Sequence, residues 1–203
     1  MPGADFFRRL GVLILPQFLD AALCDELVDA MLGSPGSPAR MAGPDFDGYV
    51  DEHSRSARLI DLGLGRTAPL TDRVGALRPD FERFFGLPLA DHGTVDAVIY
   101  PSGGFFLPHR DRGAPGDSGD PEIERRALTV VVMLNRQASA PARGEYSGGD
   151  LRLFGLIPDD PWRTMGFAVE PSVGQLIAFR AETLHDVTPV TAGNRCVLVC
   201  WFH

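Results

Sequence analysis

The sequence Phe105-Phe106-Leu107-Pro108-His109-Arg110-Asp111 places an apolar run directly before a histidine and an aspartate. Residues two apart in a β-strand point to the same face. We therefore expect His109 and Asp111 to aim an imidazole and a carboxylate into one cavity, where they can hold a metal if a third ligand comes from elsewhere. Taken alone, an H-x-D pattern arises easily by chance and favours a hydrogen-bonded structural histidine.

The region around this stretch is rich in short β-prone segments. From residue 95 to the end they follow one another, separated by turns that carry glycine or proline. Such a succession predicts an antiparallel sandwich or barrel. The expected strands are 95–100, 105–111, 127–135, 150–154, 164–170, 175–179, 185–190 and 195–202.

The first 94 residues have a different, helix-rich pattern. We expect a strand at 10–18, a helix at 21–32 capped by Asp20, a loop at 33–48, a strand at 58–62 and a helical region at 67–85 bent or interrupted at Pro79. Helices first and strands after indicate an α+β fold with the front helices packed on one sheet. We expect one domain, 1–203, with a front section 1–94 and a β-core 95–203.

Composition excludes several classes of protein. The chain has 203 residues, a formal net charge of −8 and no lysine, which argues against broad nucleic-acid binding and excludes a Schiff-base lysine. Cys24, Cys196 and Cys200 form no C-x-x-C pair, which fits a reducing compartment and predicts a cytoplasmic protein. The N-terminal apolar run, 12–15, is too short for a signal peptide or a membrane span. The sequence does not predict an oligomeric state.

Two further residues support the prediction of a metal site at His109 and Asp111. His185 opens a predicted strand, and Arg195 begins the apolar final strand ten residues later. A buried arginine needs an anionic partner, and a bound carboxylate would satisfy it; a surface arginine at a strand end is the alternative. Two imidazoles and one carboxylate form the facial triad of non-haem Fe(II) oxygenases.

Several motifs in order resemble one family. Residues 100–111 (YPSGGFFLPHRD), 126–135 (RALTVVVMLN), 147–154 (SGGDLRLF) and 171–201 are similar to Fe(II)/2-oxoglutarate-dependent oxygenases of the prolyl 4-hydroxylase-like superfamily. The likeness covers about 95–202, and the strand–helix opening at 10–32 is also typical of the family. It implies a double-stranded β-helix, a jelly-roll or cupin-like barrel of two facing sheets.

The resemblance also implies roles for individual residues. His109, Asp111 and His185 would bind Fe(II) and be catalytic, and Arg195 would pair with the distal carboxylate of the cosubstrate 2-oxoglutarate. Tyr100 and Trp201 match aromatics at the cosubstrate pocket, although core packing would also explain them. O2 is the second cosubstrate that the family implies, and ascorbate is a candidate reductant.

The reaction that the resemblance implies is hydroxylation of an unactivated C–H bond, because Asp111 occupies a position that related halogenases leave free for halide. The expected substrate is a prolyl residue in a peptide or protein; the alternatives are a free amino acid or a natural-product intermediate. A non-catalytic barrel that senses a metal or a carboxylate is a hypothesis of another class.

Further expectations concern the pocket and its entrance. Met133 stands where oxygen-sensing relatives carry a tyrosine for the distal carboxylate, so that contact is expected to be lost or replaced. Arg55 and Arg112 are candidate substrate contacts, with solvated surface arginines as the alternative. The polar stretch 112–126 is either a lid or a disordered loop.

Overall fold

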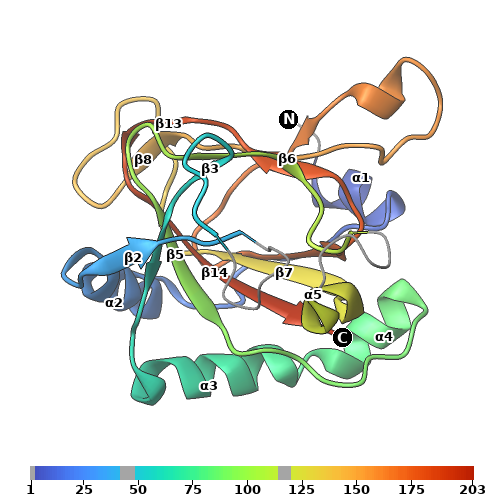
Figure 1. Cartoon of the computed structure of the whole chain (residues 1–203), viewed down its shortest axis with the longest axis horizontal. Helices are drawn as coiled ribbons and strands as arrows, with labels where there is room; N and C mark the ends of the chain where they lie inside the picture. The colour runs from blue at the N-terminus through green and yellow to red at the C-terminus, as the bar shows by residue number, and fades with distance from the viewer. Residues whose placement is uncertain (1–2, 42–48, 114–119) are drawn as a thin grey trace.

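Two antiparallel sheets face each other, and helices cover the outer side of the larger one (Figure 1). The structure is a computed structural model that describes residues 3–41, 49–113 and 120–203. The larger sheet has the strand order β1-β11-β7-β14-β5-β4-β2 and the smaller one β10-β9-β12-β6-β3, with β13-β8 as a separate pair. This is the α+β arrangement expected for a double-stranded β-helix.

The bounds of the elements follow. The larger sheet contains β1 (Leu13–Leu15), β2 (Gly36–Pro38), β4 (Arg58–Ile60), β5 (Asp96–Tyr100), β7 (Leu128–Met133), β11 (Leu176–Arg180) and β14 (Arg195–Phe202). The smaller sheet contains β3 (Arg55–Ser56), β6 (Phe105–His109), β9 (Leu151–Leu153), β10 (Phe167–Ala168) and β12 (His185–Val187). The separate pair is β8 (Tyr146–Gly148) and β13 (Val190–Gly193). The helices are α1 (Ala4–Arg9), α2 (Ala21–Leu32), α3 (Leu64–Gly75), α4 (Arg78–Phe85) and α5 (Pro121–Arg125), with a 3₁₀ turn at Trp162–Thr164.

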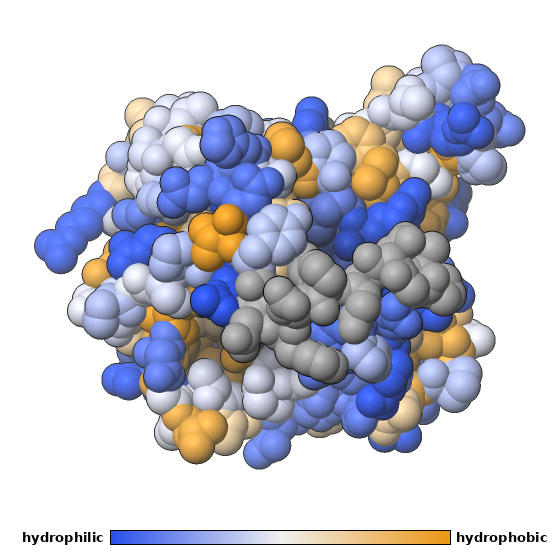
Figure 2. All heavy atoms as spheres, viewed as in Figure 1, coloured by the Kyte–Doolittle hydropathy of each residue, from blue (hydrophilic) through white to orange (hydrophobic). Residues whose placement is uncertain are grey.

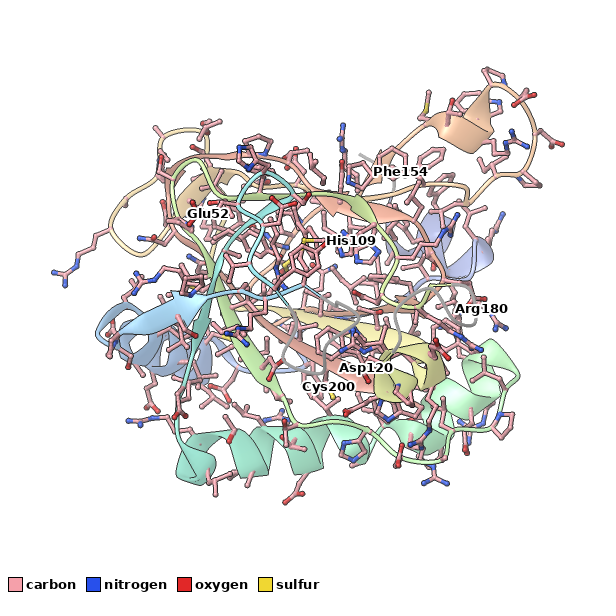
Figure 3. All side chains as sticks on the ribbon, in the orientation of Figure 1. Glu52, His109, Asp120, Phe154, Arg180 and Cys200 are labelled. Atoms are coloured by element: carbon pink, nitrogen blue, oxygen red, sulfur yellow. The ribbon has the colours of Figure 1, made fainter. Side chains whose placement is uncertain are left out.

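The central strand β14 divides the interior into two cores. Successive side chains of a strand point to opposite faces. Leu198, Cys200 and Phe202 accordingly pack against the helices, whereas Val197 packs between the two sheets. Figure 3 shows Cys200 on the helix side and His109 between the sheets. One strand thus serves a structural core on one face and the interior of the barrel on the other.

The front helices form the outer layer through apolar residues at helical spacing. In α2 these residues are Cys24, Leu27, Val28 and Met31, all buried against the larger sheet. The helix begins as expected, because the Asp20 carboxylate accepts a hydrogen bond from the Leu23 amide at 2.9 Å. In α4, Phe81 packs edge-on against Phe202 with 5.2 Å between the ring centroids.

Several boundaries differ from the expectation. Residues 4–9 form a helix that was not expected, and the strand expected at 10–18 shortens to β1, after which Gln17 has φ of 54°. The region 67–85 is interrupted, which is one of the two expected outcomes, and Pro79 lies in the first turn of α4.

Figure 2 shows polar and apolar side chains interspersed over the visible face.

Two expected loops contain regular structure. The 33–48 stretch includes β2, although the sequence Gly36-Ser37-Pro38 has little preference for a strand; pairing with β4 imposes it. Residues 42–48 lie outside the described ones. In the 112–126 stretch, α5 begins at Pro121 with the Asp120 carboxylate accepting from the Glu122 amide at 2.9 Å. Residues 114–119 lie outside the described ones, so the lid stays a prediction.

The structure also bears on the cysteines and on the absence of a membrane span expected from the sequence. Cys24, Cys196 and Cys200 are free thiols that are at most 1% exposed, so they pack as small apolar side chains. Among the described residues, no helix combines the length and the apolar character that crossing a membrane requires.

Packing of α4 on the sheet predicts a large effect of Phe81→Ala. Phe81 is fully buried, so the substitution leaves a cavity and should lower the free energy of unfolding by about 3–5 kcal/mol. The matched control is Leu64→Ala on α3, where the side chain is 80% exposed and the change should stay within about 0.5 kcal/mol. Urea unfolding followed by circular dichroism measures both, and equal effects would contradict the described packing.

Candidate metal and cosubstrate site

Two imidazoles meet across the smaller sheet. His109 on β6 and His185 on β12 are direct cross-strand partners, with 4.1 Å between their ring centroids. Nδ1 of His109 lies 2.8 Å from the Leu107 carbonyl oxygen, and Nδ1 of His185 lies 2.9 Å from that of Thr183. A carbonyl oxygen only accepts, so each Nδ1 carries a proton. In the neutral form of either ring, Nε2 is therefore the atom with the lone pair for a metal.

Aromatic packing restrains the same two rings. The Phe106 ring stacks on His109 with 3.4 Å between centroids and 16° between planes. The Phe179 ring meets His185 edge-on at 4.9 Å. Such contacts limit rotation of the imidazoles, which favours a fixed geometry of the donor atoms.

Asp111 reaches the imidazoles from just beyond the end of β6. The backbone amides of Asp111 and Arg112 both donate to the Ala181 carbonyl at 3.0 Å, and this pair of bonds fixes the turn. Oδ1 of Asp111 lies 3.7 Å from Nε2 of His109, and Oδ2 lies 3.5 Å from Nε2 of His185. The Thr129 hydroxyl, on β7 of the opposite sheet, donates to Oδ2 at 2.6 Å.

The donor set of these three residues suits a divalent metal. One ligand atom from each lies within 4.8 Å of the other two. Burial, followed by the neighbouring His185, lowers the pKa of His109 to about 3. Burial opposes ionisation of Asp111, but His185, His109 and the Thr129 hydrogen bond outweigh it and lower the pKa of Asp111 to about 2. At neutral pH Asp111 is therefore a carboxylate and His109 a neutral imidazole, the forms that ligate metals.

Arg195 is the most deeply buried charge of the cavity. Arg195 is 1% exposed, and its Nε has no hydrogen-bond partner among the described residues. One terminal nitrogen lies 3.5 Å from the Met133 sulfur, and the guanidinium carbon lies 5.2 Å from the centroid of the Tyr100 ring. Thioether and aromatic neighbours do not neutralise a guanidinium, so the site fits an anionic group that is supplied by a ligand.

Tyr146 on β8 is a second polar group beside Arg195. Burial raises the pKa of the Tyr146 phenol, while the charge of Arg195 and a side-chain hydrogen bond to it act in the opposite direction. The approach of the two side chains requires Gly149, which has φ of 67°. A Cβ there would lie 3.0 Å from Cδ of Arg195 and 3.5 Å from the Tyr146 ring. A buried hydroxyl and a buried guanidinium thus adjoin the same end of the barrel.

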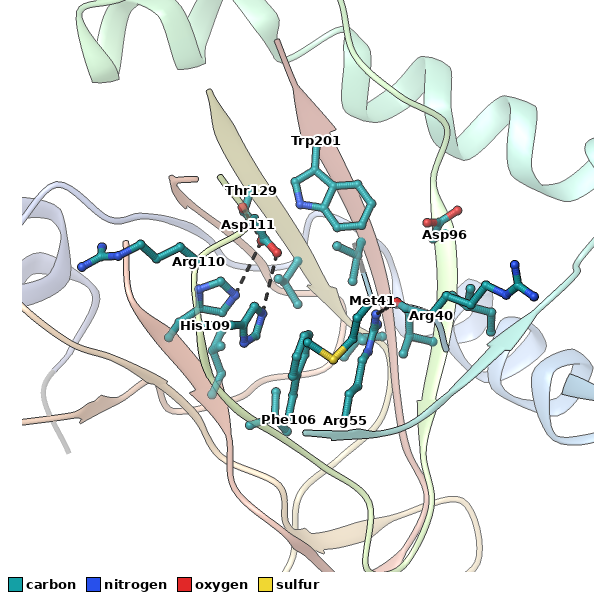
Figure 4. Close-up of a pocket in the computed structure, with 18 of the residues that line it drawn as sticks. Arg40, Met41, Arg55, Asp96, Phe106, His109, Arg110, Asp111, Thr129 and Trp201 are labelled. Carbon is teal, nitrogen blue, oxygen red and sulfur yellow. Dashed lines mark hydrogen bonds and ion pairs between the residues drawn. The ribbon is translucent and has the colours of Figure 1, made fainter. Parts of the chain in front are cut away.

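One cavity of about 340 Å³ between the sheets is lined by the three candidate ligands and by Phe106, Thr129, Tyr100 and Arg195 (Figure 4). Among the described residues, four buried nitrogen donors in its wall lack a hydrogen-bond partner. They are Nε of Arg55, Arg126 and Arg195 and Nε1 of Trp201. A wall rich in unpaired donors fits ligands that carry carboxylates.

The other predicted residues take different places. Tyr100 is the cross-strand partner of Arg195 and lines the cavity. Trp201 also lines it, but six residues along β14 from Arg195, roughly 20 Å at the rise of a strand. Arg55 lines the cavity with its guanidinium over the Phe106 ring, 4.7 Å from the centroid. Arg112 is not among the described lining residues.

Sequence reasoning missed four residues of the cavity region: Asp96, Arg126, Thr129 and Tyr146. The signal for Thr129 was present, because a polar residue inside an apolar strand needs a partner. Asp96 likewise begins an apolar strand. Tyr146 carried no signal, because only the folded chain brings it to Arg195, 49 positions later in the sequence.

Comparison with known proteins identifies related families and folds. The family model described as 2OG-Fe(II) oxygenase superfamily matches residues 95–203. A PKHD-type hydroxylase of Pseudomonas fluorescens is 27% identical over 166 residues, covering 76% of this chain and 66% of the relative. A PKHD-type hydroxylase of Saccharophagus degradans is 28% identical over 102 residues, covering 50% of this chain and 39% of the relative. The chain thus spans about two thirds or less of these relatives.

Solved structures share the fold over nearly the whole chain. A prolyl-4-hydroxylase of Pseudomonas putida superposes with a TM-score of 0.66 at 25% identity, covering 98% of this chain and 96% of the other. A prolyl hydroxylase of Trichoplax adhaerens, solved with a peptide fragment of hypoxia inducible factor, gives a TM-score of 0.70 at 18% identity. It covers 98% of this chain and 86% of the other.

Burial of His109 predicts an acid-sensitive fold in the metal-free protein. The folded-state pKa of about 3 lies below the ordinary value of 6.5, so the unfolded chain binds the proton more readily. The contribution of His109 to stability is present above pH 6.5 and is lost as the pH falls toward 3. Urea unfolding of the metal-free protein at pH 7 and pH 4.5 should show this loss, and His109→Gln should reduce it. Equal pH dependence in both proteins would contradict the assignment.

Proposed function

The chain belongs to the 2OG-Fe(II) oxygenase superfamily, and on that basis we propose that it is an Fe(II)- and 2-oxoglutarate-dependent dioxygenase that hydroxylates an unactivated C–H bond. The observation that carries the proposal is the convergence of His109, Asp111 and His185 in a cavity that also holds the buried Arg195, whose Nε has no partner among the described residues. We propose that residues 1–203 act as one domain, in which 1–94 supply packing and 95–203 the site.

Nε2 of His109, Nε2 of His185 and the Asp111 carboxylate would hold the iron. When bound, iron with 2-oxoglutarate and O2 supplies the oxidation, in which one oxygen atom enters the substrate C–H bond and the other enters succinate as CO2 leaves. The chain's own contribution is to hold the donor atoms fixed. Thr129 keeps Asp111 oriented, and the two carbonyl acceptors keep each imidazole in the required tautomer.

Arg195 would receive the distal carboxylate of 2-oxoglutarate. A guanidinium binds a carboxylate through two parallel hydrogen bonds, and the burial of Arg195 strengthens the contact. We propose that Tyr146, reaching in from β8, takes over the contact that Met133 cannot make. Tyr100 would pack along the same cosubstrate, and Trp201 would lie nearer the substrate end of the cavity. Ascorbate is the reductant that we propose for keeping the iron ferrous.

The target of the reaction is proposed from the relatives. The names of the two solved prolyl hydroxylases favour a prolyl ring. The ring can be part of a peptide or of a free amino acid or natural-product intermediate, and both fit a cavity whose wall also contains Phe106 and Val199. Arg55 is a proposed substrate contact because it lines this wall, and Arg112 is a second, from its place directly after Asp111.

Asp111→Ala should abolish formation of succinate, because it removes one of three metal ligands and leaves no carboxylate in its place. The first measurement is an anaerobic titration with Fe(II) and 2-oxoglutarate, followed by the visible metal-to-ligand band. The second is succinate release after air is admitted. Asp72→Ala, on the exposed face of α3, is the matched control and should behave like the unaltered protein.

Normal turnover of 2-oxoglutarate in Asp111→Ala would contradict the proposal. Binding of Fe(II) and 2-oxoglutarate by the unaltered protein without succinate, whatever substrate is offered, would instead favour a non-catalytic sensor. A mass-spectrometric search for the gain of one oxygen atom among proline-containing peptides and amino acids identifies the target.

Tyr146→Phe should weaken binding of 2-oxoglutarate while leaving the chemical step intact. A hydrogen bond to a charged group contributes about 1.5–3 kcal/mol, so KM for 2-oxoglutarate should rise about tenfold or more with kcat little changed. Arg195→Gln should raise it further, because it removes the charge itself. Steady-state kinetics and calorimetric titration measure both, and an unchanged KM in Tyr146→Phe would exclude the proposed contact.

A further inference from the structure

The Arg126 guanidinium lies in the cavity wall beside Trp201, which we take as the substrate end, and forms no ion pair with a described carboxylate. The Arg126 side chain makes no hydrogen bond or ion pair with any described residue, and its Nε is buried. Its guanidinium stacks on the Trp201 indole, 3.8 Å from the ring centroid, and both residues line the cavity. Stacking fixes the plane of the guanidinium and leaves its edge free for an anion.

Asp96 is an opposite charge in the same wall. It lies on β5 with Val199 as its cross-strand partner, on the face of the sheet that also presents Val98 and Tyr100 to the cavity. Its carboxylate makes no hydrogen bond or ion pair with a described residue within 4.0 Å. Burial raises the pKa of Asp96, whereas the charges of Arg126 and Arg55 lower it, which places all three in one electrostatic neighbourhood.

These charges adjoin the proposed iron site. Four carboxylates act on Arg126; that of Asp111 has the strongest effect, followed by Glu122, Asp120 and Asp96. Figure 4 shows Asp96 across the cavity from His109 and Asp111, beyond the Trp201 ring. A small molecule held by Arg126 and Asp96 would therefore present its carbon skeleton to the metal ligands.

Arg195 and Arg55 are less suited than Arg126 to bind an anionic group of the substrate. Arg195 lies at the other end of β14, roughly 20 Å from Trp201 along the strand. The cosubstrate is proposed to bind at the Arg195 end. Arg55 is partly engaged, because one of its terminal nitrogens donates to the Arg40 carbonyl at 3.0 Å. Nε1 of Trp201, by contrast, is a further buried donor without a partner beside Arg126.

From these positions we propose that the substrate is a free α-amino acid, with its carboxylate on Arg126 and Trp201 and its ammonium group on Asp96. An internal residue of a peptide carries neither charge and would leave both side chains unpaired in the cavity wall. A free amino acid pairs both at once. The inference rests on the proposed hydroxylase function and specifies its substrate class.

The test uses the whole protein loaded with Fe(II) and 2-oxoglutarate without oxygen. L-proline is titrated first and the other free protein amino acids after it, with binding measured by calorimetry and by the change of the visible band. Each amino acid that binds is compared with its N-acetyl derivative, its C-terminal amide and a peptide that contains it internally. The free form should bind at least about tenfold more tightly than each blocked form.

Two variants separate the ends of the ligand. Arg126→Gln should remove the preference for the carboxylate over the amide but keep the preference for the free amine. Asp96→Asn should do the reverse. Arg125→Gln and Asp72→Asn, two exposed positions, are the matched controls and should keep both preferences. A purely structural role, such as mutual screening of Arg126 and Asp96, would weaken all forms equally and would overturn the proposal.

The remaining outcomes distinguish failure of the proposed substrate class from failure of the proposed function. Equal or tighter binding of blocked amino acids or peptides, or no binding of any free amino acid, overturns the substrate class. If the same protein still converts 2-oxoglutarate to succinate, the proposed function stands. Absence of both 2-oxoglutarate binding and succinate overturns the function itself and the substrate class with it.

Discussion

The position of Asp111 is the constraint on which the site depends. The two imidazoles are placed by the pairing of β6 with β12, but Asp111 lies beyond the ladder and has no such partner. It is held by the double hydrogen bond to the Ala181 carbonyl and by the Thr129 hydroxyl from the opposite sheet. The bond to Thr129 joins the two sheets at the point where the carboxylate faces both rings. The geometry of the donor set therefore follows from the spacing between the sheets.

Much of this arrangement could be predicted from the sequence. Strand alternation predicts that His109 and Asp111 face one cavity, and they meet there, although β6 ends at His109 and a turn places Asp111. A histidine and an arginine ten residues apart near the last strand complete the pattern. The apolar spacing of 21–32 predicts α2 with its cap at Asp20, and the structure has both. These features depend on local periodicity, which a single sequence displays.

What could not be predicted depends on contacts between distant segments. β2 exists because β4 offers an edge, and its own residues would not form a strand. Tyr146 becomes relevant only where β8 meets the start of β14, and the close approach there needs the glycine at 149. Arg126 follows a short helix, so strand periodicity gives no direction for its side chain. In each case the deciding neighbour lies far away along the chain.

The two faces of β14 serve separate purposes. Outward residues such as Leu198 and Phe202 pack against the helical layer, whereas inward residues line the cavity. A substitution at Val199 or Trp201 can therefore alter what the cavity accepts while the contacts that hold the helices stay intact. The same separation recommends inward positions as targets for redesign, because new specificity there does not require rebuilding the scaffold. A chain of this construction can diversify its chemistry while its architecture is conserved.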